Sequence, residues 1–574
     1  MRLIFNLIPL LNFEQKKSFL ILFFLTFFTV FLEVISIGSI VPVVLFFLGE
    51  QLINVKFFFS FSSDFLSNLS DRDIIKYILI FIFFAFSLKN LLLIYMVFLE
   101  SRISWSIEFF FRRKLFKKFL KEDLDYHLKN DSSFKINMIY KECSYIFHGI
   151  LNFIIITTEV IFSSAIFALL LFYYPKVFLV LFFLILFTIY FYNQFTKKRL
   201  KDLSKQRQLG DQLLIKRIHN GINGIREMKI YNTQQKFLED FTKNTFELFN
   251  VSRLLQALVK IPKIILEISI ITGLFFVIGV FIYLGNPPQS ILALLSLLVV
   301  SAIRVLPSIL RLYNSYQALK IAKPSFELIT NQFKKDMISK EVNNYINKED
   351  KIDFDFIELK NLKYSIPENK RVLFNNVNFI IKKNEITGIK GESGVGKSTL
   401  IDILSTFKKP TNGSVLAGNF NIHEHSSLWQ KKISYVPQEI FLLDDTVYMN
   451  VCFKEKSMID FKKFTECCKK AEIQKFIEEL PKGIDTIIGE AGSKLSQGQK
   501  QRLGIARALY HDPQILIMDE ATNALDKETE EKVMQIIKKI SSNVTTIIVS
   551  HSDKPLGFCN KVFEIKNQEI NNIK

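Results

Sequence analysis

The most constraining feature of this 574-residue sequence is a series of long apolar segments confined to its first half. About 20 apolar residues are enough to cross the hydrocarbon core of a bilayer as a helix. Six segments meet this requirement, at residues 18–48, 74–99, 146–173, 177–195, 258–284 and 289–313. No segment after residue 331 does. With 49% hydrophobic residues, the chain is expected to be a membrane protein and not a wholly soluble or disordered one.

Composition also predicts the division into domains. We assign residues 1–330 to an all-α transmembrane domain with six spans and long cytoplasmic helical extensions, residues 331–352 to a linker, and residues 353–574 to a soluble α/β domain. The N-terminal segment MRLIFNLIPLLNFEQKK has no clear small-residue cleavage site, so it is interpreted as an amphipathic entry helix.

The distribution of positive charge predicts the orientation in the membrane. The net charge of +19 is concentrated in residues 100–145 and 196–257, whereas the segments facing the other way hold only Lys56, Arg72 and Lys176. Loops rich in Lys and Arg stay cytoplasmic, so the N-terminus and the soluble domain are both expected inside. The charge then needs no nucleic acid partner. The five cysteines all fall on the cytoplasmic side, where neither a disulfide framework nor a Cys/His metal site is expected.

A glycine-rich segment in the soluble domain predicts phosphate binding. It follows the strand-like EITGIK and precedes the helical pattern LIDILSTF, which is the strand, loop and helix context that a P-loop requires. Lys397 is expected to contact the β and γ phosphates of a nucleotide, and Ser398 to hold Mg²⁺. The candidate binding residues are Gly391, Glu392, Ser393, Gly394, Gly396, Lys397, Ser398 and Thr399.

A second motif, Ile515-Leu-Ile-Met-Asp519-Glu520, ends an apolar run with two carboxylates. Such a run is typical of a buried parallel strand, and ligands bind beyond the carboxyl ends of these strands. Asp519 is then placed to support Mg²⁺, and Glu520 to polarise the water that attacks the γ-phosphate. An ordinary strand end with surface acids is the alternative.

The order of these motifs resembles the ATP-binding cassette (ABC) transporters over residues 353–574. The resemblance rests on the P-loop, YVPQE, LSQGQ, IMDE, ATNALD and IVSHS. It implies ATP and Mg²⁺ as cofactors. Gln438 would sense Mg²⁺, and His551 would contact the γ-phosphate. Ser496, Gly498 and Gln499 would begin a helix that faces ATP held by a partner chain, and Asp526 would cross the dimer interface.

Two positions depart from the usual family pattern. Gln497 stands where Gly is commonest in the signature, and this change is expected to be silent. Ile366 stands where an aromatic residue stacks on adenine. Since residues two apart in a strand face the same side, Tyr364 is the candidate replacement.

The resemblance also implies an exporter-type half-transporter that works as a dimer. Each composite site needs a second cassette, and the intact Glu520 and signature fit a homodimer, with a heterodimer left open. Segments 123–134 and 220–230 occupy the places of the coupling helices. Alternating access driven by ATP is the implied mechanism.

Charged residues inside the predicted spans leave two interpretations open. Each costs up to about 3 kcal/mol at mid-membrane, so each must pair or face water. In the first interpretation they neutralise one another, as Lys263 and Glu267 can one helical turn apart. In the second, cations line a cavity and bind an anionic group such as pyrophosphate. The candidate substrate residues are Lys89, Lys263, Arg304 and Arg311.

Several features resemble the bacterial lipid-linked oligosaccharide flippases, the ABC branch that moves polyprenyl-pyrophosphate glycans across the inner membrane. They are SAIRVLPSILRLYNSYQ, VKIPKIILE, the charge at Lys89 and an outer-loop segment with Phe57, Phe61, Phe65 and Leu69 on one helical face. A flippase for an amphiphilic, lipid-linked substrate is therefore the first expectation. Export of another cargo (phospholipid or lipid A, peptide, drug) is the second, and ATP-coupled gating is the third.

Overall fold

The structure, a computed structural model, describes residues 12–38, 71–173, 175–284, 288–339, 353–366 and 371–574. It divides into two compact units. The first comprises residues 1–122 and 127–345, and the second comprises residues 123–126 and 346–574. The predicted outer-loop helix with Phe57, Phe61, Phe65 and Leu69, and most of the predicted entry helix, lie outside the described residues.

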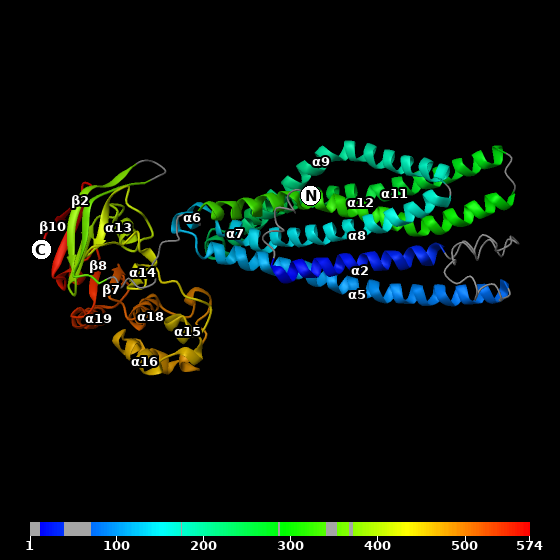
Figure 1. Ribbon diagram of the computed structural model, residues 1–574. Coiled ribbons are helices and arrows are strands. Elements are labelled where there is room, and N and C mark those ends of the chain that lie inside the picture. Colours follow the sequence, from blue (N-terminus) through cyan, green and yellow to red (C-terminus); the bar gives the residue numbers. More distant parts are fainter. Residues whose placement is uncertain (1–11, 39–70, 174, 285–287, 340–352, 367–370) are drawn as a thin grey trace. The chain divides into compact units, whose positions relative to one another are not determined.

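The first unit is built from long helices that run side by side (Figure 1). The long helices are α2 (Phe13–Gly38), α5 (Asp71–Phe119), α8 (Cys143–Tyr173), α9 (Pro175–Asn223), α11 (Gln234–Tyr283) and α12 (Pro288–Ser339). Short elements join them: α6 (Leu124–Lys129), α7 (Ser132–Asn137), the π-helix η4 (Met138–Glu142) and α10 (Ile225–Ile230).

Five helical segments among the described residues are long and apolar enough to cross a membrane. They are Phe13–Ile35, Leu79–Phe119, Ser132–Ala168, Phe178–Asn223 and Gln234–Tyr283. The sixth predicted span, 289–313, falls in α12, where the side chains before Leu306 are not described. The helices extend well beyond the apolar segments, because polar residues with good helix propensity continue them. A multi-pass membrane domain with helical extensions is thus confirmed.

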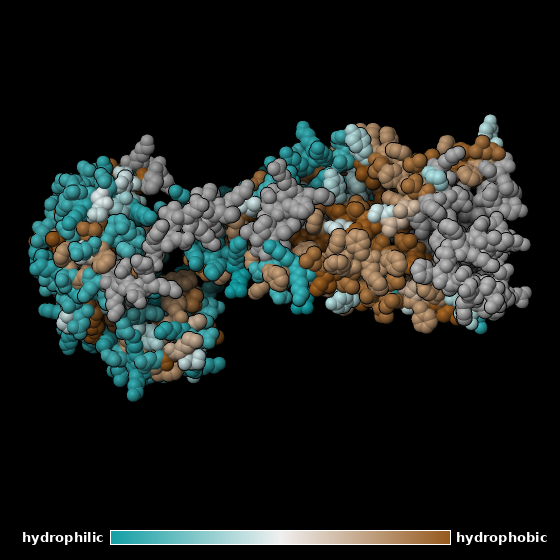
Figure 2. Space-filling view, in the orientation of Figure 1, coloured by the Kyte–Doolittle hydropathy of each residue, from teal (hydrophilic) through white to brown (hydrophobic). Residues whose placement is uncertain are grey.

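Apolar side chains form a continuous surface over one part of this unit, and hydrophilic side chains gather at the end where α6 and α7 lie (Figure 2). Many large apolar side chains of the spans are exposed in the single chain, for example Phe83, Phe187 and Phe275. Exposed apolar side chains at this density are stable in lipid and not in water. The polar end therefore marks where the helices leave the apolar layer.

The second unit contains two sheets flanked by helices (Figure 1). A four-stranded antiparallel sheet has the order β2-β1-β4-β5, and a six-stranded sheet has the order β10-β9-β3-β8-β7-β6. The strands are β1 (Phe356–Ser365), β2 (Val372–Lys382), β3 (Ile386–Gly391), β4 (Asn412–Ala417), β5 (Phe420–Asn421), β6 (Ile433–Val436), β7 (Ile515–Asp519), β8 (Thr545–Val549), β9 (Lys561–Lys566) and β10 (Glu569–Asn572). The helices are α13 (Lys397–Leu404), α14 (Ser426–Gln430), α15 (Val447–Cys452), α16 (Phe461–Lys470), α17 (Gln474–Glu479), α18 (Gln497–Tyr510), α19 (Lys527–Ile540) and α20 (Asp553–Gly557).

The apolar run of β7 is explained by burial on both faces of the sheet. Ile515 and Ile517 pack in one core, and Leu516 and Met518 pack in the other. Successive strand residues point to opposite faces, so a strand covered on both sides needs an unbroken apolar sequence. The expected α/β domain with a buried parallel strand is confirmed.

Strand register brings the candidate motifs to one edge of the larger sheet. The parallel strands β3, β8 and β7 align Ile389 with Val549 and Val549 with Asp519. The P-loop follows β3, His551 follows β8, and Glu520 follows β7. Segments separated by more than 100 residues in sequence are thus held together by the main-chain hydrogen bonds of the sheet.

Candidate nucleotide-binding site

The loop after β3 has the backbone geometry of a phosphate cradle. Gly394 and Gly396 have φ angles of +78° and +117°, which only glycine adopts without strain. Gly396 caps α13, which begins at Lys397, so the first-turn N–H groups of this helix point back at the loop. A helix N-terminus of this kind attracts anions.

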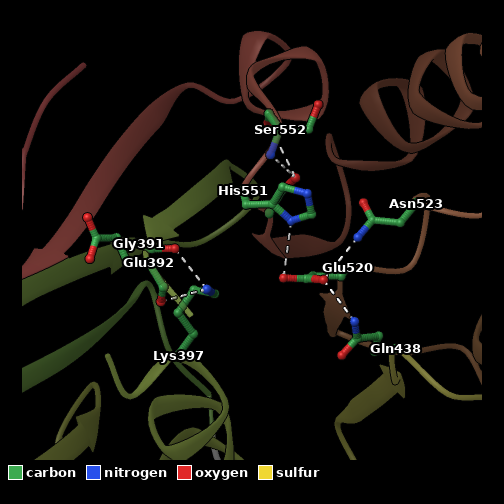
Figure 3. Close-up of polar contacts among 9 residues, drawn as sticks. Gly391, Glu392, Lys397, Gln438, Glu520, Asn523, His551 and Ser552 are labelled. Atoms are coloured by element: carbon green, nitrogen blue, oxygen red, sulfur yellow. Dashed lines mark hydrogen bonds and ion pairs between the residues drawn. The ribbon is translucent and has the colours of Figure 1, made fainter. Parts of the chain in front are cut away.

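Lys397 is held against its own loop. Its Nζ donates to the carbonyl oxygens of Gly391 at 2.8 Å and Glu392 at 3.0 Å (Figure 3). The loop side chains Glu392 and Ser393 are exposed, as is Ser398 in the first turn of α13, where Thr399 follows it. A bound phosphate would compete with the two carbonyls for the ammonium group, since a charged oxygen is the stronger acceptor.

Glu520 lies at the centre of a group of polar side chains from three segments, which follow β6, β7 and β8 (Figure 3). Its Oε2 accepts from Gln438 Nε2 and from Asn523 Nδ2, both at 2.9 Å, and its Oε1 lies 3.4 Å from His551 Nδ1. The Glu520 side chain is only 15% exposed. Its φ of +49° is left-handed, a strained conformation for a non-glycine residue that occurs often at functional sites. Three of the sequence-predicted residues are therefore brought together here.

Asn523 was missed by the sequence analysis. It reaches Glu520 because a turn in which the Asn523 N–H donates to the Glu520 carbonyl folds the chain back. The residues concerned are three apart, and Asn often bonds locally in turns. That turn preference, in a segment directly after two carboxylates, is the signal that could have identified it.

Asp519 is a buried carboxylate at the end of β7. It is 8% exposed, and burial, followed by the neighbouring Glu520 charge, raises the pKa of its carboxyl group. Tyr435 donates to it at 3.3 Å. Ser398, Gln438 and Asp519 offer hydroxyl, amide and carboxylate oxygens, the hard donors that Mg²⁺ prefers. A divalent cation would offset the cost of the buried charge, so the donor set fits Mg²⁺. No cluster of three or more His, Cys, Asp or Glu side chains suited to a metal occurs among the described residues.

The LSQGQ segment begins helix α18 as predicted. Ser496 Oγ accepts from the Gln499 N–H at 3.2 Å, and Gln499 Oε1 accepts from the Ser496 N–H at 2.8 Å. This reciprocal capping box leaves Gln497 as the first helical residue. A side chain at Gly498 would place its Cβ 3.1 Å from the Ala524 carbonyl oxygen. A larger residue at 498 would therefore crowd the Ala524 carbonyl, whereas glutamine is accommodated at 497.

Asp526 begins helix α19. Its Oδ1 accepts from the Thr529 N–H at 3.0 Å, and this hydrogen bond keeps the pKa of the Asp526 carboxyl group low. The side chain is exposed. Within the chain, Asp526 therefore acts as a helix cap, which is compatible with the predicted position at a dimer interface but does not test it.

The prediction that Tyr364 stacks on adenine is wrong. Tyr364 is 6% exposed and packs in the core beneath the antiparallel sheet, so neither ring face is available to a base. Tyr364 and Ile366 do lie on the same side of the strand, as the prediction assumed, but that side faces the core. Ile366 is partly buried against the same core.

Three of the four candidate substrate residues form ion pairs within the chain. Lys89 Nζ lies 2.6 Å from Glu33, and both are buried. Arg311 pairs with Glu159, and Lys263 lies 3.8 Å from Glu267 one turn along α11. Arg304 is in α12, with its side chain outside the described set. Internal neutralisation, one of the two interpretations left open by the sequence, is therefore observed for these three.

Comparison with known proteins identifies both units. Residues 374–523 match the family described as ABC transporter, and residues 40–301 match the ABC transporter transmembrane region. Fold and site define a P-loop nucleotide-binding domain joined in one chain to a helical membrane domain. The chain belongs to the ABC transporters and has the domain arrangement of an exporter-type half-transporter.

Relatives extend this comparison over most of the chain. A leukotoxin translocation ATP-binding protein of Mannheimia haemolytica is 29% identical over 426 residues, which cover 72% of this chain and 58% of that protein. A heterocyst differentiation ATP-binding protein of Nostoc is 30% identical over 356 residues, which cover 61% of this chain and 56% of that protein. The chain thus spans somewhat over half the length of these curated relatives.

A solved structure shows the same fold. The structure of a bacterial Atm1-family ABC exporter with ATP bound superimposes with a TM-score of 0.76 at 18% identity, covering 93% of this chain and 94% of that one. At this identity the similarity concerns the fold and not the cargo.

Proposed function

We propose that this chain is an ATP-driven exporter in which Glu520 activates water for hydrolysis of ATP. The observation that carries the proposal is the Glu520 carboxylate, held by Gln438, Asn523 and His551 at the sheet edge where the P-loop also begins. A partly buried, oriented carboxylate is suited to accept a proton from an attacking water. The nucleotide's phosphates would lie on the N–H groups of the P-loop and α13.

Each residue then has a defined task. Lys397 leaves the Gly391 and Glu392 carbonyls for the β and γ phosphates, and His551 contacts the γ-phosphate from the β8 side. Ser398, Gln438 and Asp519 would hold Mg²⁺, which neutralises phosphate charge when bound. Among the described residues no aromatic side chain is assigned to the adenine base.

The working unit is proposed to be a homodimer. The α18 N-terminus, with Ser496 and Gly498, needs a nucleotide opposite it, and a partner's P-loop would supply one. Two identical chains would form two equal sites by two-fold symmetry. We place this dimer in a bacterial inner membrane, with the N-terminus and the cassette cytoplasmic, because the basic segments 100–145 and 196–257 favour that orientation.

For the cargo we propose an amphiphile, with two candidates. A polyprenyl-pyrophosphate-linked oligosaccharide remains the candidate drawn from the sequence resemblance, and Arg304 is the cation that this interpretation still needs. The ion pairs at Lys89, Lys263 and Arg311 lower the positive charge on offer to a pyrophosphate. A peptide or protein cargo is the second candidate, favoured by the relative named for leukotoxin translocation.

The Glu520→Gln variant tests the ATPase proposal. It removes the carboxylate but keeps the shape, so ATP turnover should fall about 100-fold or more while ATP binding is retained. Turnover would be measured as phosphate release from purified protein in proteoliposomes, and binding with labelled ATP. Wild-type turnover in the variant would contradict the role assigned to Glu520.

Reconstitution tests the cargo. Proteoliposomes containing wild-type or Glu520→Gln protein would be supplied with a lipid-linked oligosaccharide, a phospholipid or an amphipathic peptide. Only the true cargo should cross the bilayer in an ATP-dependent, Glu520-dependent manner. If an Arg304→Gln substitution leaves ATP-driven flipping of the lipid-linked sugar unchanged, pyrophosphate recognition by Arg304 is ruled out.

A further inference from the structure

The border between the apolar and polar parts of α9 carries an unusual group of cations. Aromatic residues of the apolar part, among them Tyr190, Phe191 and Phe195, are exposed. The next turns carry Lys197, Lys198, Arg199, Lys201 and Lys205, all exposed, which we call the basic border. Aromatic residues followed at once by cations are typical of a helix that crosses the surface of a membrane.

Packing fixes the direction in which the basic border faces. Leu200 and Leu203 are buried against Leu255 of α11, with Ile321 of α12 beside them. The helix therefore presents Leu200 and Leu203 to its neighbours, and the exposed cations of the basic border are turned away from this core. The basic border is a fixed surface of the bundle and not a flexible tail.

The basic border has no acidic partner within the described part of the chain. Some cations elsewhere in the same unit form ion pairs with acids. Such pairs are Arg112–Glu108, Lys141–Asp211, Lys216–Asp131, Lys263–Glu267, Arg311–Glu159 and Lys323–Glu327. For the five cations of the basic border, by contrast, the described residues offer neither an ion pair nor a hydrogen bond. Asp202 is the acid closest to them in sequence, and it is exposed.

Neighbouring helices add further positive charge. On α12, Lys320 Nζ donates to Asn193 Oδ1 of α9 and lies 4.3 Å from the Tyr316 ring centroid. On α11, Arg253 and Lys260 lie on either side of the leucines that contact Leu200, and both are exposed. Folding therefore gathers like charges at one height of the bundle, which is unfavourable unless an anion is close by.

We propose that the basic border binds the phosphate of anionic lipid headgroups. The helix has its apolar side chains directly before this border and its cations within it, so a lipid with acyl chains along Phe191 and Phe195 would place its phosphate among the lysines. A lipid headgroup and a soluble phosphate share this chemistry, and the adjoining apolar surface favours the lipid. Juxtamembrane cations of this kind each strengthen attachment to an anionic surface several-fold.

The test compares two double variants of the full-length protein. In the first, Lys197→Gln with Lys201→Gln removes two charges one turn apart on the basic border. In the control, Lys236→Gln with Lys243→Gln removes two exposed charges from the polar part of α11. Glutamine is a good helix former, so both helices are retained. Retained lipid would be counted by native mass spectrometry after extraction from bilayers with equal phosphatidylglycerol and phosphatidylcholine.

Wild-type protein and the α11 control should retain phosphatidylglycerol in preference to phosphatidylcholine. In the basic-border variant the ratio of retained phosphatidylglycerol to phosphatidylcholine should be about tenfold lower. Equal preference in all three proteins would overturn the proposal. Soluble inorganic pyrophosphate, added during extraction, should not displace the lipid. Full displacement by pyrophosphate at the same concentration as phosphatidylglycerol would overturn the assignment to lipid. No ATP is present, so the result does not depend on the proposed ATPase activity.

Discussion

At the scale of single residues, the Glu520 carboxylate is restrained by polar side chains at both of its oxygens. Gln438 and Asn523 donate to the same oxygen, and His551 approaches the other. A carboxylate restrained from both sides loses little freedom when it must face a water molecule. Asn523 touches only Glu520 in this group, so we regard it as a positioning residue.

A neutral and a negatively charged replacement of Asn523 should have different effects if Asn523 positions the Glu520 carboxylate. Asn523→Ala removes one donor to an ionised group, which is worth about 1.5–3 kcal/mol, so kcat should fall about tenfold or more with KM for ATP nearly unchanged. Asn523→Asp has the same shape but cannot donate and repels Glu520, so its kcat should be lower still. Steady-state ATPase kinetics would check this order.

A packing role for Asn523 predicts the opposite order, because aspartate fills the same space as asparagine. The Glu520→Gln background provides the control. There the target charge is gone, and neither Asn523 variant should change ATP binding further. A loss of thermal stability in Asn523→Ala alone would also favour packing over positioning.

At the scale of elements, Pro262 in α11 is compensated by a side chain from another helix. Proline has no N–H, so the Leu258 carbonyl four residues earlier lacks its helical donor. The Tyr192 hydroxyl of α9 donates to this carbonyl at 2.8 Å. An unsatisfied carbonyl is expensive where no water can replace the bond, so this contact ties α9 to the proline position of α11.

Tyr192→Phe removes only the hydroxyl group and should destabilise the membrane domain by about 1–3 kcal/mol. Thermal unfolding in detergent would measure the change, and Tyr190→Phe is the matched control because Tyr190 is exposed on the same helix. In a Pro262→Ala background the helical N–H is restored, and the Tyr192→Phe penalty should largely disappear. An equal penalty in both backgrounds would show that the hydroxyl matters for another reason.

Elements with strong local patterns could be predicted from the sequence. The P-loop, the apolar strand β7 and the start of α18 at Ser496 depend on local spacing, and all three are found. The pairing of Lys263 with Glu267 is local as well. The Lys89–Glu33 pair joins residues far apart in sequence, and only the packing of α2 against α5 decides it. The Tyr364 prediction failed because the period of a strand shows which residues share a face but not which face packs on the core.

At the scale of the whole molecule, one chain holds both halves of a nucleotide site but at separate places. The P-loop lies at the end of β3, and the signature begins α18. If two chains complete each other's sites, a dimer of two differently inactivated chains can still contain one intact site.

Mixing two inactive variants would test this arrangement. Lys397→Ala disables the P-loop, and Ser496→Arg blocks the signature, so a homodimer of either should be inactive. A mixed dimer has one site with both defects and one with neither. Tandem purification on two different tags retains only the mixed dimers, so about half of the wild-type number of sites should be intact. ATPase activity of co-expressed, tandem-purified chains would measure the recovery. No recovery in a purified mixed dimer would mean either that each chain completes its own site or that turnover requires two intact sites. A covalently linked dimer with a single Lys397→Ala substitution would distinguish these outcomes, because it keeps one intact site in either arrangement and is inactive only if turnover requires two.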